Sequence, residues 1–379
     1  MTSHLLTSFV RLHDTQPLES GVSSDAVTKA ESPDPETLLV HVRKHGRYPL
    51  SYSTLQPDLE YYPERIDVDG PGFIAYRTIR EPFRTFRVVL GDPVCADADR
   101  ASLLNGFLAA SEPHFHCVFL QVHSPTATIL SEHGYYVNEM GDETVLELSR
   151  LEEHKPRYLR NQLRLLRKHG LKVDIVHSDE ADFEILRAVS DEWVRHSTIH
   201  GHELTFLARP FAGRPEPDVL IATLTDAGQI VGFAVLDPFF VDGKLAYLIN
   251  IIRAIDDHAS HRRPILLAAV AMRLQHEYGV SSLYLGFSPP YSHACPIAHA
   301  SPFLGAILQA LYRYGNWLYN FRGIYEHKRQ YHGATVKVYV ASRYRFPVSA
   351  VIASFHAMDI VLWRQLLRGA SRVLYWLRK

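Results

Sequence analysis

The sequence predicts a mixed α/β protein made of two consecutive units of the same kind. Runs rich in β-forming residues alternate with single helical segments along the chain. A hydrophobic content of 46% with 21% charged residues is typical of a globular protein. The 379 residues suffice for two domains, each with its own core. We expect a flexible leader at 1–33, a domain at 34–150, a second domain at 151–345 and a C-terminal helix at 346–379.

The first unit is predicted to begin with a well-capped helix. Asp34 is a favoured N-cap, Pro35 suits the first helical position and Gly46 can end the helix. The apolar periodicity then gives strands at 72–79, 86–92 and 116–122, helices at 97–112 and 124–134, and a closing strand at 143–149.

The second unit is predicted to contain a three-stranded meander between two helices. Asp242-Gly243 separates two β-rich runs and is a strong hairpin signal. The predicted strands are 172–177, 218–226, 229–241, 244–255, 281–288 and 335–342, and the helices 179–197 and 262–279 are followed by another before the last strand. This order is that of the N-acetyltransferase-like fold, and the first unit can be read the same way with shorter elements. We therefore expect tandem domains of this fold joined by a basic helix.

Charge, cysteine content and hydropathy exclude several classes of protein. The net charge of −1 gives no field over the whole protein that would attract nucleic acid. The three cysteines have no CxxC spacing, which argues against a zinc site and a disulfide framework and suits a reducing cytosol. No signal peptide or apolar run of about 18 residues is present. We expect a cytoplasmic protein, free or peripheral on the inner face of the cell membrane.

A basic helix is predicted between the two units. Its cations Arg157, Arg160, Arg164 and Arg167 recur at helical spacing, with Lys168 beside them. Leu159, Leu163 and Leu166 form a separate apolar row that can pack on a domain. The stripe is either a solvated connector face or a surface that contacts phosphates, and its register on an otherwise neutral protein favours phosphate contact.

The usual coenzyme A loop of this fold is missing. That loop is rich in glycine and holds pyrophosphate on backbone N–H groups at a helix N-terminus. The equivalent stretch, 256–263, reads DDHASHRR, with no glycine and two carboxylates at its start. Acyl transfer remains plausible on this sequence, but coenzyme A is disfavoured as the donor.

Several stretches resemble a known family. They are FIAYRT, VVLGDP, YLRNQLRLLRKHGL, SDEW, GQIVGFAVLDP, INIIR, YGVSSLYLGFSP and GIYEHKRQYHGATVKVYVA, in family order from about residue 60 to 341. The chain is similar to the C-terminal catalytic domain of bacterial phosphatidylglycerol lysyltransferases (multiple peptide resistance factors), and to soluble relatives that contain only that domain. The resemblance implies tandem acetyltransferase-like domains that use aminoacyl-tRNA to esterify a lipid glycerol headgroup. It implies aminoacyl-tRNA as co-substrate, with no separate cofactor. The basic stripe at 157–168 is the candidate surface for binding that tRNA.

The resemblance assigns candidate site residues. The family motif Asp-x-x-Arg appears as Asn250-Ile-Ile-Arg253, so an amide stands where an aspartate helps to bind a cationic aminoacyl group. A neutral or acidic amino acid is therefore favoured over lysine or arginine. Lys328 is retained in the motif HKRQY, whereas Gln330 replaces a second lysine and Gly333 a proline. The substrate-binding candidates are Asn250, Tyr247, Ser288 and Tyr331.

The predicted chemistry needs positioning and charge stabilisation more than a covalent step. The aminoacyl ester is already activated, so the enzyme has to orient the reactants and stabilise a tetrahedral oxyanion. Lys328 and Arg253 are the catalytic candidates for this and for gripping the end of the tRNA. The alternative for Lys328 is an exposed cation on an amphipathic helix. Arg253 lies in an apolar strand and needs a partner or a wet cleft.

The histidines invite a metal interpretation, which we reject. His196 and His200 have HxxxH spacing, with His202 and Glu203 close by, and His114 and His116 form an HxH pair. HExxH is absent and the helix is expected to end near Gly201, so we predict no metal. The loop around His200 is expected to shape the acceptor pocket instead. The absence of GxSxG argues against hydrolysis.

The segment 346–379 alternates apolar residues with cations. Trp363, Trp376 and Tyr375 among arginines suit an anchor on anionic lipid. The alternative is a helix packed on its own domain or on a second subunit.

The leading hypothesis is an aminoacyl-tRNA-dependent transferase whose acceptor is a lipid headgroup such as phosphatidylglycerol. The rivals are the same transfer to a small metabolite, a conventional acyl-coenzyme A N-acyltransferase, and a non-catalytic module that binds tRNA or lipid.

Overall fold

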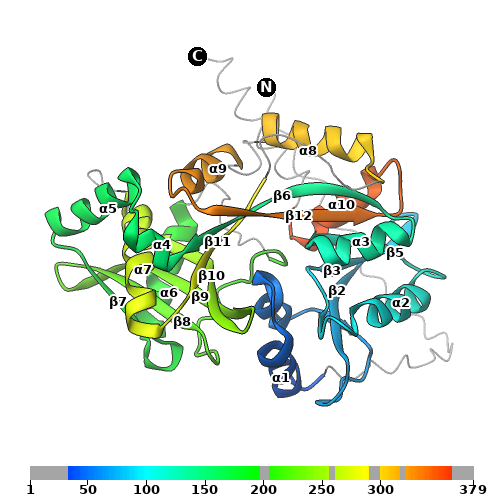
Figure 1. Cartoon of the computed structure of the whole chain (residues 1–379), viewed down its shortest axis with the longest axis horizontal. Coiled ribbons are helices and arrows are strands. Elements are labelled where there is room, and N and C mark those ends of the chain that lie inside the picture. Colours follow the sequence, from blue (N-terminus) through cyan, green and yellow to red (C-terminus); the bar gives the residue numbers. More distant parts are fainter. Residues whose placement is uncertain (1–32, 197–204, 256–260, 290–298, 316–320, 361–379) are drawn as a thin grey trace, which may run out of the picture. The chain divides into compact units, whose positions relative to one another are not determined.

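The computed structural model describes residues 33–196, 205–255, 261–289, 299–315 and 321–360. Over these residues the chain has the predicted mixed α/β fold, with helices packed on one large mixed sheet (Figure 1). Residues 1–32 of the predicted leader and 361–379 of the predicted C-terminal helix lie outside this range.

The predicted start of the first unit is confirmed. Helix α1 spans Pro35–His45, the Asp34 carboxylate accepts a hydrogen bond from the backbone N–H of Thr37, and Gly46 is the C-cap. The elements that follow are η1 Pro49–Leu55, β1 Glu60–Tyr62, β2 Gly72–Glu81, β3 Arg84–Leu90, β4 Val94–Cys95, α2 Arg100–Ser111, β5 His116–Val122, α3 Ser124–Glu132 and β6 Tyr136–Glu147.

Strand β6 begins at Tyr136, earlier than the predicted start at 143. Its first half carries polar side chains, which hide the strand from a hydropathy pattern. These side chains are buried and paired: Asn138 bonds the backbone of Ser301, and Glu139 pairs with Lys337 at 2.5 Å.

The second half contains the predicted helices, meander and hairpin. Its elements are α4 Leu148–Glu153, α5 Arg157–Lys168, β7 Lys172–His177, η2 Ser178–Glu180, α6 Phe183–His196, β8 Leu220–Asp226, β9 Gln229–Val241, β10 Lys244–Ala254, α7 Arg262–Tyr278, β11 Ser282–Ser288, α8 Pro302–Tyr314, α9 Phe321–Arg329, β12 Ala334–Ser342 and α10 Val348–Ala357. Asp242 and Gly243 both have positive φ, as a type I′ turn requires, because this turn matches the twist of the β9–β10 hairpin.

The two halves share the centre of one sheet. The strand order is β1-β2-β3-β5-β12-β6-β11-β10-β9-β8-β7, with β4 paired to β2. The last strand, β12, therefore lies between β5 and β6 of the first half and is antiparallel to both. On its other edge, β6 pairs with β11 of the second half. The predicted boundary between domains at 150 thus falls just after a strand that pairs with both halves. The apolar periodicity could not predict this strand order, because it shows which face of a strand is buried but not which strands lie beside it.

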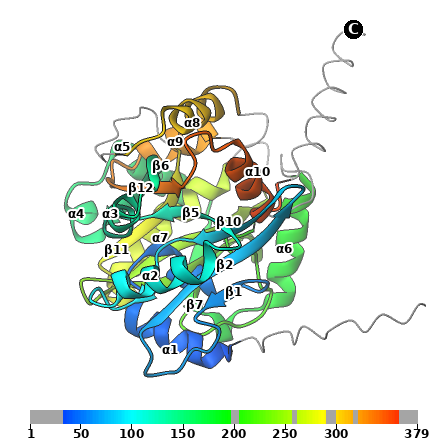
Figure 2. The same cartoon turned by 90° about the vertical axis from the view of Figure 1, so that its right-hand side faces the viewer.

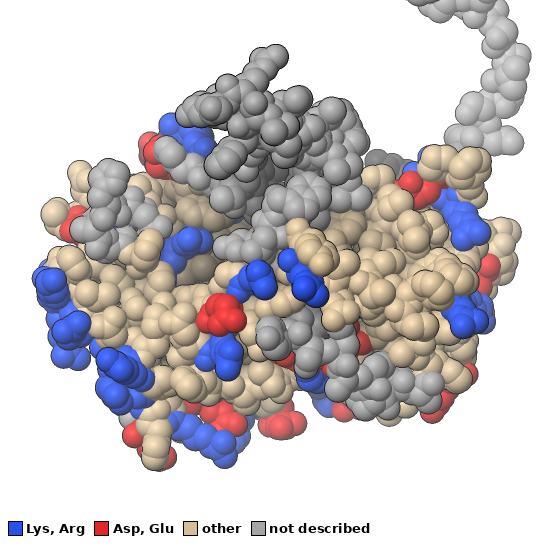
Figure 3. Space-filling view, turned by 90° about the horizontal axis from the view of Figure 1, so that it is seen from above, with Lys and Arg blue, Asp and Glu red and all other residues tan. Residues whose placement is uncertain are grey.

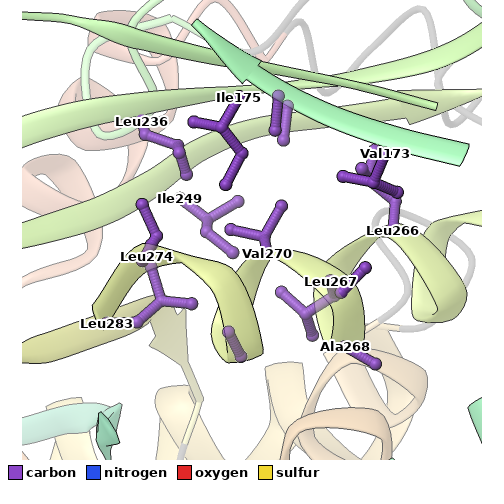
Figure 4. Packing of buried hydrophobic residues seen from close by; sticks show 14 of the residues in the cluster. Val173, Ile175, Leu236, Ile249, Leu266, Leu267, Ala268, Val270, Leu274 and Leu283 are labelled. Atoms are coloured by element: carbon purple, nitrogen blue, oxygen red, sulfur yellow. The ribbon is translucent and has the colours of Figure 1, made fainter. Parts of the chain in front are cut away.

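Helices α6 and α7 cover opposite faces of the second half. Leu266, Val270 and Leu274 of α7 pack against Leu236 and Ile249 of the sheet (Figure 4). On the other face, Leu186 and Val189 of α6 pack with the strand side chains that point away from α7. Figure 2 shows α6 along that side. The two helices thus enclose the strands that carry the predicted site. Each large aliphatic side chain buried in this way contributes about 1.5–3 kcal/mol to the stability of the fold.

The described part of the predicted 346–379 helix ends before residue 360. Helix α10 ends at Ala357, and Asp359 has φ +57, a left-handed conformation that a continuing helix would not allow. The N–H of Ile360 then bonds the carbonyl of Phe355 and closes the helix end. Within the described segments, every helix is too short or too polar to cross a bilayer.

Because β12 lies between β5 and β6, the two halves should unfold in one transition. Native-state hydrogen exchange in rising denaturant should give the amides of β3 and those of β9 the same opening free energy. Exchange of β3 at clearly lower denaturant than β9 would show that the halves are independent domains.

Candidate functional site

The second half opens where two parallel strands part. β10 and β11 pair from Ala246 to Leu248 and from Ser282 to Tyr284. Beyond these residues β10 stays paired with β9, while β11 stays paired with β6 and shifts its register there between Tyr284 and Phe287. Gly286 lies at the parting point with φ +76, a conformation that favours glycine. We call this opening the β10–β11 wedge.

A β-bulge at Asn250 sets the direction of the side chains after it. Ile249 pairs with Leu236 and Ile251 with Val235, so Asn250 is the extra residue. Tyr247 and Ile249 consequently face α7, whereas Ile251 faces α6. Bulges commonly re-aim side chains beside functional sites. Here the bulge turns Arg253 towards α6.

Lys328 of α9 reaches the β10–β11 wedge. Its Nζ donates a hydrogen bond of 2.7 Å to the carbonyl oxygen of Phe287. A Cβ placed on Gly286 would lie 3.7 Å from this Nζ and 3.6 Å from the side chain of Leu248, so the ammonium sits where the strands separate. Burial lowers the pKa of Lys328 to about 7, although the charge of Glu143 acts in the opposite direction. The exposed-cation alternative does not fit this half-buried, hydrogen-bonded amine.

Aromatic side chains connect Lys328 to the basic helix. His327 Nδ1 lies 3.3 Å from the hydroxyl of Tyr158 on α5, and Tyr331 packs edge-on against both rings. Burial, followed by the charges of Lys328 and Arg263, lowers the pKa of His327 to about 4. Tyr331 is itself 1% exposed and belongs to the hydrophobic cluster around α7, which we call the α7 core. The structure therefore gives it a packing role beside the site.

Arg253 is buried on the α6 face. It donates a hydrogen bond to the Ser190 hydroxyl, and its guanidinium lies 5.2 Å from the Trp193 ring and 5.8 Å from that of Phe211. The partners of this charge in the apolar strand thus include a hydroxyl and two aromatic faces. Lys328 of α9 contacts β11, whereas Arg253 belongs to β10 and packs against α6.

Asn250 holds a neighbouring loop in place. Its Oδ1 accepts from the N–H of Arg209 at 3.1 Å and its Nδ2 donates to the Arg209 carbonyl at 2.9 Å. The Arg209 guanidinium is buried and forms ion pairs with Asp237 and Glu216. An aspartate at position 250 could accept the first bond but could not donate the second. The amide found here is thus the side chain that this loop contact requires.

The two remaining substrate-binding candidates differ in their freedom to bind a ligand. Tyr247 is buried in the α7 core and its hydroxyl donates to the Asp218 carbonyl at 3.3 Å. Ser288 ends β11, one residue after the Lys328 acceptor, and is 2% exposed. Within the described part of the chain its hydroxyl has no hydrogen-bond partner. Ser288 is therefore the better placed of the two to bind substrate.

The five basic candidates on α5 are all exposed. They are Arg157, Arg160, Arg164, Arg167 and Lys168. The apolar row packs as predicted, with Leu159 fully buried and Leu163 and Leu166 against the α7 core. Figure 3 shows Lys and Arg side chains along the left-hand edge, the side on which Figure 1 places α5.

A buried ionic network lies at the corresponding position of the first half, and the sequence did not predict it. Asp92 follows β3 and His123 follows β5, the parallel pair equivalent to β10 and β11. His123 Nδ1 lies 2.7 Å from Asp92, and its Nε2 lies 3.2 Å from Glu143 of β6. Tyr48 stacks on the imidazole with ring centres 4.3 Å apart. Burial lowers the pKa of His123, but Asp92 and Glu143 outweigh it and raise the pKa to about 10. An ionisable residue after an apolar strand was the available signal for Asp92 and His123.

The predicted acceptor-pocket loop and the His200 to Glu203 cluster lie outside the described residues. The described His, Cys, Asp and Glu side chains form no group of three or more that could hold a metal ion. His116 instead pairs with the hydroxyl of Tyr344.

Residues 40–342 match the family described as "Phosphatidylglycerol lysyltransferase, C-terminal". Among solved structures, L-PGS from Bacillus licheniformis is 22% identical with a TM-score of 0.70, covering 87% of this chain and 97% of that one. A C-terminal domain assigned to a lysylphosphatidylglycerol synthetase of Agrobacterium fabrum is 22% identical with a TM-score of 0.68, covering 86% and 96%.

A conserved protein of unknown function from Bacteroides thetaiotaomicron is 14% identical with a TM-score of 0.54, covering 82% of this chain and 96% of that one. No curated protein matches the sequence. At these identities the solved structures support the fold, whereas the family match spans most of the chain.

Replacing His123 with Gln should destabilise the protein by about 3–5 kcal/mol, because two buried carboxylates lose their shared cation. The pKa of His123 is raised from 6.5 to about 10, so its stabilisation is complete below pH 6.5 and is lost as the pH rises towards 10. Urea unfolding should show a larger loss at pH 6 than at pH 9. His133→Gln, at an exposed histidine, is the control, and an equal loss at both pH values would refute a charged His123.

Proposed function

The chain belongs to the family of phosphatidylglycerol lysyltransferase C-terminal domains, and from that premise we propose that it transfers an aminoacyl group from charged tRNA to a hydroxyl of a lipid headgroup such as phosphatidylglycerol. The observation that carries the proposal is Lys328, a half-buried amine with a depressed pKa at the β10–β11 wedge. Perturbed amines of this kind cluster at sites of catalysis.

In the proposed reaction the acceptor hydroxyl attacks the aminoacyl ester carbonyl. The new C–O bond forms a tetrahedral oxyanion, its collapse breaks the ester bond, and the terminal ribose hydroxyl of the tRNA leaves with the proton that the acceptor lost. The Lys328 ammonium stabilises the oxyanion, and its enclosed position makes that charge more effective than it would be in water. The Ser288 hydroxyl, which has no hydrogen-bond partner among the described residues and follows the Phe287 carbonyl that binds Lys328, orients the substrate.

Arg253 has a supporting role in this scheme. It is fixed by Ser190 and lies close to two aromatic rings, so its charge is placed before substrate arrives. We propose that this charge helps to attract the phosphate–ribose end of the tRNA.

The amino acid transferred is proposed to be neutral or acidic. In this chain Asn250 bonds both backbone groups of Arg209 and carries no charge. A cationic side chain would find no counter-ion at this position.

The tRNA is proposed to bind along α5. Five exposed cations lie on this helix, and Tyr158 of the same helix contacts His327, the neighbour of Lys328. Phosphates on the basic face would therefore lie on the helix that packs beside the reaction site. This arrangement favours an aminoacyl-tRNA donor over the coenzyme A alternative and a transferase over a passive binding module.

Replacing Lys328 with Ala should lower kcat for lipid aminoacylation by about 10²–10³ while tRNA binding changes little. The assay uses purified protein, tRNA charged with radiolabelled amino acids and phosphatidylglycerol vesicles, with ribonuclease-treated controls. Lys172→Ala, at an exposed lysine of β7, is the matched control. Label in a soluble product would assign a small-molecule acceptor, and consumption of acetyl-coenzyme A alone would refute the tRNA donor.

The wild-type rate should fall as the pH rises through about 7, because the ammonium form of Lys328 is lost there. A rate that rises through the same range would instead assign Lys328 as the base that accepts the hydroxyl proton.

Neutralising Arg160, Arg164 and Arg167 together with Gln should weaken tRNA binding and make its salt dependence shallower by about 2–3 in log K against log salt. Filter binding at several salt concentrations measures both. The control replaces the exposed Arg65, Arg80 and Arg150 with Gln. Equal slopes of log K against log salt in the two variants would exclude α5 as the tRNA surface.

A further inference from the structure

A buried carboxylate lies beside the strand that holds Lys328. Glu143 of β6 is the register partner of Phe287 on β11, whose carbonyl accepts the hydrogen bond from Lys328. Paired residues of antiparallel strands have Cα atoms about 5 Å apart. The Glu143 side chain is fully buried, and its charge favours the ammonium form of Lys328.

Glu143 is held rigidly from the first half of the chain. Gln121 Nε2 donates to Oε1 at 2.7 Å, and His123 Nε2 lies 3.2 Å from Oε2. His123 is fixed in turn by Asp92, which accepts from both its ring and its backbone N–H. His123 is a single cation between two carboxylates, Asp92 and Glu143, so the network keeps a negative charge that the Lys328 ammonium can balance.

Other charged and titratable groups near these residues have different partners or act elsewhere. Lys337 of β12 pairs with Glu139 and Asp142 on β6. His327 of α9 is held neutral by burial and by the charges of Lys328 and Arg263. Tyr284 of β11 is buried, and burial together with the charge of Glu143 raises its pKa to about 12, so it is neutral near pH 7.

We propose that Glu143, fixed by His123 and Gln121, is a positioning residue that sets the place and charge of the Lys328 ammonium at the β10–β11 wedge. This inference rests on the proposed function for its catalytic consequence. The first half thereby contributes to the reaction without touching substrate: the network that fills its own strand opening supplies the counter-ion for the opening of the second half.

The test measures Lys328 directly and activity separately. The ε-carbon resonance of Lys328, assigned with Lys328→Arg in ¹³C-lysine-labelled protein, is titrated in wild type, Glu143→Gln and Glu139→Gln. Glu139 is the matched control, because it is also a buried carboxylate of β6 but pairs with Lys337. Glu143→Gln should lower the Lys328 pKa by about one unit, and Glu139→Gln should leave it unchanged.

The pH profile of aminoacyl transfer should shift by the same amount in Glu143→Gln, which a purely structural role would not produce. If Glu143→Gln does not fold, His123→Gln provides the second test: removal of the cation beside Glu143 should raise the Lys328 pKa. An unchanged Lys328 pKa in the folded variant overturns the proposal. A shifted Lys328 pKa in a protein that transfers no amino acid would uphold this assignment of Glu143 and refute the proposed function.

Discussion

The pairing of β12 with β5 and β6 is the constraint on which the rest of the structure depends. Tyr339 pairs with Val122, and Val336 pairs with Glu143, so the end of the chain completes the sheet of its beginning. Without β12, the edges of β5 and β6 would expose unpaired N–H and C=O groups in the middle of the protein. Its presence fixes β6, and β6 fixes β11, the strand whose carbonyl receives Lys328.

The openings after the two parallel strand pairs, β3–β5 and β10–β11, have similar geometry but different contents. In the first half the space after β3 and β5 is filled by Asp92, His123 and the ring of Tyr48. In the second half β10 and β11 part around Gly286, and the amine of Lys328 reaches the opening. A filled opening stabilises the sheet, whereas the opening in the second half holds the amine on which the proposed function depends.

Local signals in the sequence predicted most of the elements, and failures came where tertiary pairing decides. Asp34, Gly46 and Asp242-Gly243 act through their own backbone, so their roles were readable. The retained Lys328 was found through family resemblance, which carries no information on its surroundings. The His123 network was missed because its members are far apart in sequence and follow no motif. Asn250 was interpreted only as a lost charge, since its contact with the backbone of Arg209 depends on a distant loop.

The position of β12 near the end of the chain also has a consequence for synthesis on the ribosome. The first half is made early, yet its strands β5 and β6 lack their shared neighbour until residue 342 has been translated. Contacts that join such distant segments form slowly, because a long loop must close first. Lys328 emerges just before β12, so the growing chain acquires its amine and the strand that completes the sheet almost together. A nascent chain cut short before residue 342 therefore lacks the strand on which the shared centre of the sheet depends.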